Sequence, residues 1–151
     1  MPNTEPDHPS VKVNSGVHVV AAVIQDNKTP SMILISKRSQ NAHQGGLWEF
    51  PGGKVDPSET AYRALKRELK EELGIEITSA EPLMQLHHDY QDKKIFLDMW
   101  TVTDFNGEAR GMEGQECRWV LLQDLLSASS GYQFPQANQP VLEKLRHLNK
   151  V

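Results

Sequence analysis

Three glutamates lie close together on one predicted helix, at a spacing that suits metal binding. Residues 61–73 repeat apolar side chains at the helical period of about 100° per residue. Glu68 and Glu72 fall inside the apolar arc of this helix, and Glu71 falls at its edge. Carboxylates at positions i and i+4 repel each other, and partial burial adds to that cost unless a positive charge compensates. No basic residue lies on the arc, so the pattern predicts a hard divalent cation such as Mg²⁺, which binds carboxylates, carbonyls, water and phosphates.

The plain alternative is a solvated acidic face on a slightly rotated helix. A single pair of glutamates would favour that alternative, whereas a third glutamate and the glycines Gly52 and Gly53 just upstream favour a metal site. A glycine turn can bring backbone oxygen close to an ion, so the Gly52 carbonyl is a candidate ligand. The interpretation that the two glycines only turn the chain into the helix has equal weight on sequence alone.

The whole segment 53–75 resembles the signature of the Nudix hydrolases without a departure. The signature positions are Gly53, Glu59, Arg67, Glu68, Leu69, Glu71, Glu72, Gly74 and Ile75. The resemblance implies an α/β/α sandwich, and an enzyme that hydrolyses a nucleoside diphosphate linked to another group. It also implies Mg²⁺ as the cofactor, with Mn²⁺ able to substitute.

The resemblance assigns roles within this segment. It implies that Glu68, Glu71 and Glu72 bind the metal and that Glu68 is the better candidate for the general base, although spacing alone does not identify the base. Arg67 lies about 100° away on the helix and is expected to orient a glutamate rather than to contact phosphate. A distant acidic ligand is also implied, and Glu113 lies in a predicted loop where it fits that role; without the resemblance it would be a solvated loop residue.

Further segments resemble the bacterial MutT branch, the 8-oxo-dGTP diphosphatases. These segments are Ser36–Arg38, His43, Leu47–Lys54, Met112–Gln115 and Phe134–Val141. The likeness implies that Arg38, Glu49, Phe50 and Asn138 bind the nucleotide, with His43 near its phosphate. It also implies hydrolysis of an oxidised purine nucleoside triphosphate to the monophosphate and pyrophosphate, which cleanses the nucleotide pool.

Each of these residues also has an ordinary structural interpretation. Arg38 suits the charged end of a strand, His43 a loop, Phe50 a core and Asn138 the N-cap of the last helix. Other functions also stay open: hydrolysis of another nucleotide, such as CTP, dCTP or a nucleotide sugar, or a catalytically inactive Nudix-like binding module. Such modules usually lose the metal-binding glutamates, all of which are present here.

The coarse pattern predicts a mixed sheet covered by helices on two sides, an α/β fold with two main helices. The expected strands are 17–24, 32–38, 47–50, 75–79, 82–90, 94–103 and 117–122, with a tight turn at 51–53. The first helix is expected to begin with Asp56 as N-cap and to end at Gly74. Glu59, three residues after the cap, is expected to complete a capping box. The second helix is expected at 140–148.

Length and composition predict one domain. The 151 residues suit a domain at 15–151 after a flexible tail at 1–14. A formal net charge of −4 argues against binding of a nucleic-acid polymer. The chain has no long apolar run and no signal-peptide pattern, and its one cysteine fits a reducing cytosol. We therefore expect a cytoplasmic, monomeric enzyme that acts on a small nucleoside triphosphate, away from membranes.

Overall fold

The computed structural model describes residues 6, 16–38, 46–91, 93–127 and 129–149. The tail predicted at 1–14, apart from residue 6, lies outside the described residues, and so does His43.

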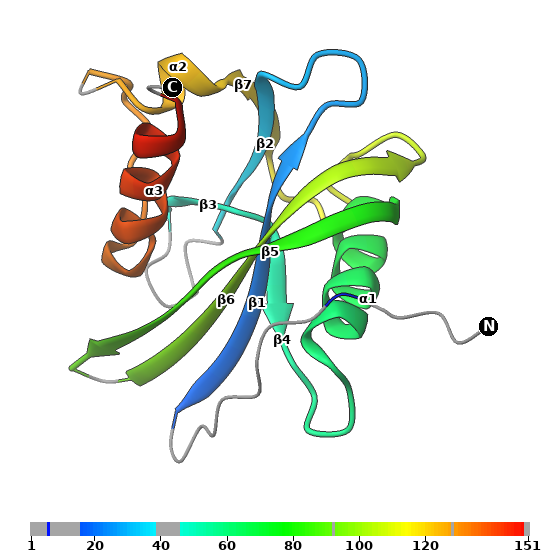
Figure 1. The fold of residues 1–151 in the computed structure, drawn as a ribbon, viewed down its shortest axis with the longest axis vertical. Coiled ribbons are helices and arrows are strands. Elements are labelled where there is room, and N and C mark those ends of the chain that lie inside the picture. Colours follow the sequence, from blue (N-terminus) through cyan, green and yellow to red (C-terminus); the bar gives the residue numbers. More distant parts are fainter. Residues whose placement is uncertain (1–5, 7–15, 39–45, 92, 128, 150–151) are drawn as a thin grey trace.

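Seven strands form one mixed sheet with strand β1 near its centre (Figure 1). In chain order the elements are β1 Val17–Gln25, β2 Met32–Lys37, β3 Trp48–Glu49, β4 Gly52–Lys54, α1 Ala61–Leu73, β5 Glu76–Tyr90, β6 Lys93–Asn106, β7 Cys117–Leu121, α2 Leu122–Leu125, the 3₁₀ helix η1 Gln136–Asn138 and α3 Gln139–Asn149. Strand β1 pairs antiparallel with β2 and β4 and parallel with β6. Strand β5 pairs with β6, while β3 and β7 pair with β2.

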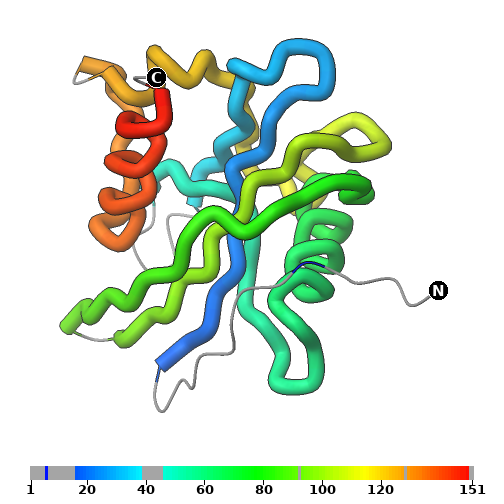
Figure 2. Tube along the Cα trace, viewed as in Figure 1, coloured from blue at the N-terminus to red at the C-terminus, as the bar shows by residue number. Residues whose placement is uncertain are grey.

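The sheet has a hydrophobic core on each face because both faces carry a helix. Along β1, Val20, Ala22 and Ile24 belong to the core under α1, whereas Ala21 and Val23 belong to the core under α3. Helices α1 and α3 lie on opposite sides of the sheet (Figures 1 and 2). This alternation explains why β1 reads as a continuous apolar run, and the predicted α/β/α sandwich is confirmed.

Helix α1 begins later than predicted. Its N-cap is Thr60, whose side chain accepts from the Arg63 N–H at 3.2 Å, so the prediction of Asp56 as N-cap is wrong. The Glu59 carboxylate does bond to the Asp56 N–H at 2.9 Å, but within a turn that precedes the helix. The end of the helix is as predicted, because Gly74 adopts the left-handed conformation and donates to the Lys70 carbonyl.

Three other details differ from the predictions. Gly52 and Gly53 belong to strand β4 rather than to a tight turn, because they pair with β1. The strands expected at 75–79 and 82–90 are one long strand, β5, with irregular pairing between Ile77 and Met84. Helices α2 and η1 were not predicted, since both are too short to show a helical period.

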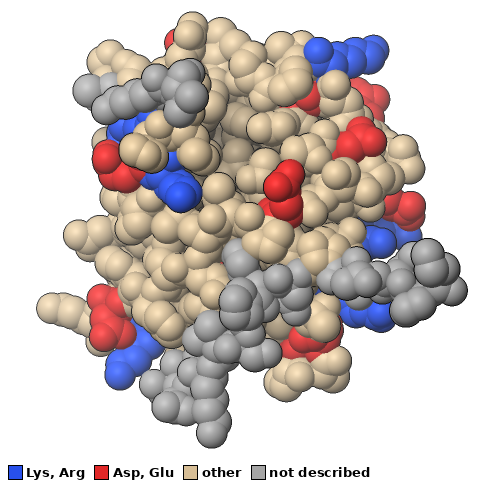
Figure 3. All heavy atoms as spheres, in the orientation of Figure 1, with Lys and Arg blue, Asp and Glu red and all other residues tan. Residues whose placement is uncertain are grey.

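Charges of both signs are interspersed on the face seen in Figure 3, where the described residues form no continuous basic patch. No helix in the described part of the chain is long and apolar enough to cross a membrane.

Candidate active site

Helix α1 turns the Glu68 carboxylate toward strand β4, where two glycines leave room for it. A Cβ atom on Gly53 would overlap the Glu68 carboxylate, and a Cβ atom on Gly52 would overlap the Val20 carbonyl oxygen in β1. Only glycine lets the backbone pass this closely between the central strand and the helix. The close approach predicted for Gly52 and Gly53 is therefore present, although the element is a strand.

The Gly52 backbone lies beside Glu72. The Gly52 N–H hydrogen bonds to the Glu72 carboxylate. In the ladder between β1 and β4, the Ala22 N–H donates to the Pro51 carbonyl at 3.0 Å. Bonded and non-bonded positions alternate along an antiparallel pair, so the Gly52 N–H and carbonyl point away from β1. This direction suits the ligand role predicted for the Gly52 carbonyl.

Arg67 joins the glutamates of the site through its guanidinium. Nη1 lies 2.9 Å from Glu68 Oε1 and 3.5 Å from Glu71 Oε2, while Nη2 lies 2.5 Å from Glu59 Oε1. Nη2 also donates to the Lys54 carbonyl at 3.1 Å. Arg67 itself lies off the apolar arc, but its long side chain reaches Glu68, as expected of a residue that orients a glutamate.

Burial and mutual repulsion disfavour negative charge on the glutamates. Burial, together with the nearby carboxylates of Glu68, Glu49 and Glu113, raises the pKa of Glu72 to about 8. Burial also raises the pKa of Glu68 above its ordinary value, while Arg67 opposes the rise. A site that penalises carboxylate charge in this way would gain stability from a bound cation.

The loop that follows β6 brings Glu113 to the end of α1. The Glu72 carbonyl accepts from the Met112 N–H at 2.9 Å and from Gln115 Nε2 at 3.0 Å. Glu113 is close enough to raise the pKa of both Glu68 and Glu72. The fold therefore brings together carboxylates that are 41 to 45 residues apart in the chain.

The donor set fits a hard divalent cation. The side chains of Glu68, Glu71, Glu72 and Glu113 supply carboxylate oxygens, and Gly52 supplies a carbonyl, which are the ligand types that Mg²⁺ prefers. As placed, no three His, Cys, Asp or Glu side chains among the described residues converge tightly enough to hold an ion. One oxygen of Glu68 is instead paired with Arg67 at 2.9 Å.

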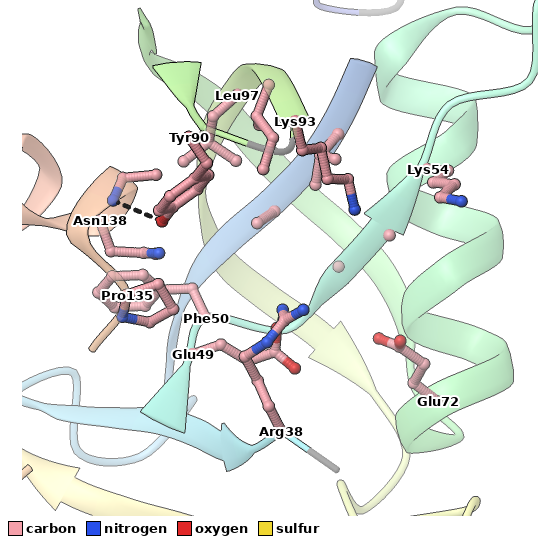
Figure 4. Close-up of a pocket in the computed structure, with 16 residues that line it drawn as sticks. Arg38, Glu49, Phe50, Lys54, Glu72, Tyr90, Lys93, Leu97, Pro135 and Asn138 are labelled. Atoms are coloured by element: carbon pink, nitrogen blue, oxygen red, sulfur yellow. Dashed lines mark hydrogen bonds and ion pairs between the residues drawn. The ribbon is translucent and has the colours of Figure 1, made fainter. Parts of the chain in front are cut away.

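A pocket of about 260 Å³ opens between β1, β4 and η1 (Figure 4). Six of the predicted residues line it: Arg38, Glu49, Phe50, Gly52, Glu72 and Asn138. Four other predicted residues lie outside its lining: Arg67, Glu68, Glu71 and Glu113. Of these, Glu68 and Glu113 are close enough to raise the pKa of Glu72. One cavity thus joins the predicted metal site to the predicted nucleotide site.

The pocket end opposite α1 is built from aromatic side chains and η1. Phe50 packs against Phe134 with ring centroids 5.1 Å apart. The Tyr90 hydroxyl accepts from the Ala137 N–H at 2.9 Å, directly before Asn138 (Figure 4). Within the described residues the Asn138 side chain has no hydrogen-bond partner, so it does not cap α3 there. Its amide is exposed to the pocket, as base recognition requires.

Arg38 and Glu49 form an ion pair in the pocket wall. Arg38 Nη1 lies 2.6 Å from Glu49 Oε1, and both side chains are about three-quarters buried. Burial raises the pKa of Glu49 although Arg38 opposes the rise. The sequence interpretation of Arg38 as a simple strand-end charge therefore misses its buried partner.

Sequence reasoning also missed four residues near the site. Lys54 and Lys93 line the pocket with cationic side chains, and Tyr90 supports η1. Gln115 bonds to the end of α1. Tyr90 and Lys93 gave no signal of their own, because their places depend on strand pairing between distant segments. Lys54 and Gln115 were noticed only as parts of the segments Leu47–Lys54 and Met112–Gln115.

Comparison with known proteins decides the family. A profile described as the NUDIX domain matches residues 19–144, most of the chain. The chain belongs to the Nudix family. Like other Nudix proteins, it is expected to depend on a divalent metal ion, and the carboxylates at the end of α1 are the candidate ligands.

Three Nudix relatives are similar over most of their length. The CTP pyrophosphohydrolase of Escherichia coli (strain K12) is 40% identical over 84% of this chain and 89% of its own. The 8-oxo-dGTP diphosphatase of the same strain is 39% identical over 77% of this chain and 87% of its own. A solved structure from work on MutT of Aliivibrio salmonicida and Vibrio cholerae superimposes with a TM-score of 0.74 at 39% identity, covering 87% of this chain and 98% of that one.

Proposed function

We propose that this Nudix protein hydrolyses 8-oxo-dGTP to 8-oxo-dGMP and pyrophosphate with Mg²⁺, and so keeps an oxidised nucleotide out of DNA. The observation that carries the proposal is that Glu72 of α1 and Asn138 of η1 line one pocket, so a nucleotide can reach both. Relatives named 8-oxo-dGTP diphosphatase support it, at 39% identity in Escherichia coli and 40% in Proteus vulgaris.

The reaction breaks the anhydride bond between the α- and β-phosphates. The oxygen of the attacking water becomes part of one of the two products, the monophosphate or the pyrophosphate. The protons of that water pass to a base and to the phosphate oxygens. The metal, when bound, supplies positive charge that stabilises the developing negative charge. Glu68, Glu71, Glu72, Glu113 and the Gly52 carbonyl would hold the ion.

Within this arrangement Glu68 is our candidate for the general base. Burial favours proton uptake by its carboxylate, and Arg67 holds one of its oxygens at 2.9 Å. Arg67 therefore orients Glu68 rather than contacting phosphate. His43, which lies outside the described residues, is proposed near the phosphates only by family likeness.

Asn138 is proposed to read the oxidised base by hydrogen-bond polarity. Guanine presents acceptors at N7 and O6, whereas oxidation at C8 places a proton on N7. An asparagine amide can accept from that N7–H and donate to O6 at the same time. Phe50 provides an aromatic wall, and the Arg38–Glu49 pair provides fixed polar groups beside it.

CTP hydrolysis is the second candidate, because the relative named CTP pyrophosphohydrolase is equally similar. Cytosine presents an amino donor at N4, which the Asn138 carbonyl could also accept. The polarity of the pocket alone therefore permits both bases.

A nucleotide panel separates the two candidates. Pyrophosphate release would be measured for 8-oxo-dGTP, dGTP, dCTP and CTP, each with and without Mg²⁺. We expect the highest kcat/KM for 8-oxo-dGTP and no turnover without metal. A higher kcat/KM for CTP would make this a CTP pyrophosphohydrolase, and tight nucleotide binding without turnover would make it a binding module.

We also propose that the protein acts as a cytoplasmic monomer on free nucleotides. The formal net charge is −4, and the described residues on the face seen in Figure 3 form no continuous basic patch for a nucleic-acid polymer. Light scattering after size exclusion should give a mass near 17.0 kDa.

A further inference from the structure

The Gln115 side chain connects two residues that the proposed function places at the metal. Its Nε2 donates to the Glu72 carbonyl at 3.0 Å, and its Oε1 accepts from the Glu113 N–H at 2.9 Å. One half-buried amide thus holds the backbone of Glu113 against the last turn of α1. No other described side chain bonds to both residues.

Glu113 depends on this backbone support for its position. Its side chain is exposed, and no described residue forms a hydrogen bond or ion pair with its carboxylate. The neighbouring Gly114 has a φ of 81°, so the backbone turns sharply beside Glu113. Without Gln115, the loop retains three backbone bonds, which run from the N–H groups of Arg110, Met112 and Gly114 to the carbonyls of Leu73, Glu72 and Gly111. No other described group accepts from the N–H of Glu113 itself.

Gln115 also has an ordinary structural role at the helix end. The last carbonyls of a helix lack partners within the helix, and the Glu72 carbonyl receives two donors from this loop. Capping alone would predict that loss of Gln115 lowers stability and leaves metal affinity unchanged. The second bond, to Glu113, has no purpose in helix capping.

We infer that Gln115 is a positioning residue that sets the Glu113 carboxylate beside the carboxylates of α1 for binding of a divalent cation. The inference rests on the proposed function, in which Glu113 is a metal ligand. Residues that orient metal ligands without touching the ion usually change metal affinity about 10- to 100-fold when they are replaced.

The test is a double-mutant cycle on metal affinity without nucleotide. Gln115→Met keeps the length of the side chain and removes its donor and acceptor. Mn²⁺ affinity would be measured by electron paramagnetic resonance for wild type, Gln115→Met, Glu113→Gln and the double variant. Gln85→Met is the matched control, since Gln85 is also half-buried and bonds to Asp98 at 3.4 Å, on another part of the sheet.

We expect Gln115→Met to weaken Mn²⁺ binding about tenfold and to have little further effect once Glu113 is replaced, because both changes act on the same carboxylate. Unchanged affinity in Gln115→Met, or equal loss with and without Glu113, would overturn the inference. Metal-free melting temperatures check that each variant folds; if Gln115→Met does not fold, Gln115→Ala replaces it, since it also removes both bonds and adds no charge. Wild-type turnover of 8-oxo-dGTP, measured in parallel, tests the proposed function separately.

Discussion

The carboxylate of Glu68 occupies the space that a side chain on Gly53 would need. Strand β4 and helix α1 therefore fit together here only because Gly53 has no Cβ atom. A side chain at this position would displace the Glu68 carboxylate. This relationship gives the first prediction.

Gly53→Ala should displace Glu68 and lower kcat about 100-fold, because misplacement of a catalytic group by about 1 Å has an effect of that size. The fold should persist, since the side chain of Glu68 can rotate away. Gly131→Ala is the control: its φ of 78° predicts lower stability with normal turnover. Normal kcat in Gly53→Ala would contradict the proposed position of Glu68.

Glu72→Gln should make the metal-free protein less sensitive to pH. The pKa of Glu72 is about 8 in the folded protein and near 4.5 when unperturbed, so the folded state binds the extra proton between these values. Stability from this group is complete below pH 4.5 and is lost as pH rises toward 8, by on the order of a few kcal/mol.

Urea unfolding in a chelator at several pH values measures this effect. Wild type should lose stability from pH 5 to pH 8, and Glu72→Gln should lose much less and be the more stable protein at pH 8. The Glu72→Gln variant should nevertheless lose most of the hydrolytic activity of the wild type. A variant that is less stable than wild type at pH 8 would show that the Glu72 charge is well compensated without metal.

Mg²⁺ should raise the melting temperature of the wild-type protein, because a ligand that binds only the folded state stabilises it by mass action. At a concentration 100 times the Kd, the gain is about 2.7 kcal/mol. The double variant Glu68→Gln with Glu72→Gln should show no such rise. Equal rises in both proteins would place the ion elsewhere or indicate general screening.

Asn138→Ala should reduce hydrolysis of 8-oxo-dGTP far more than that of dGTP. A buried polar site can reject an analogue with the wrong donors by roughly 10⁴-fold, so the ratio of the two kcat/KM values should collapse toward one. Steady-state kinetics on both nucleotides measures the ratio. Equal losses for both would mean that other residues read the base.

Tyr90→Phe should weaken the same selectivity to a smaller extent. The variant keeps the aromatic wall but removes the hydroxyl that accepts from Ala137, next to Asn138. Loss of one hydrogen bond predicts a change of roughly 2- to 12-fold in the kcat/KM ratio. Tyr132→Phe is the control, because its hydroxyl meets Arg118 at 3.4 Å outside the pocket. An unchanged ratio in Tyr90→Phe would mean that η1 holds Asn138 without this bond.

Much of the fold was predictable from the sequence because local residue patterns indicated its helices and strands. Helix α1 showed an apolar arc and a glycine stop, and β1 showed a continuous apolar run. The helix start was mispredicted because Asp56 and Glu59 form a capping-like pair in a turn, and sequence alone does not distinguish that turn from the first turn of a helix.

The sequence by itself determined the carboxylates of α1 and their placement inside an apolar arc, since helical spacing depends only on neighbours within two turns. Only the tertiary structure decided what faces them. The contact of Gly53 with Glu68, the reach of Arg67 and the approach of Glu113 through Gln115 all depend on how α1, β4 and a distant loop pack together. Side-chain reach and packing between segments far apart in the chain leave no periodic trace in the sequence, which explains why Tyr90, Lys93 and the bonds of Gln115 emerged only from the fold.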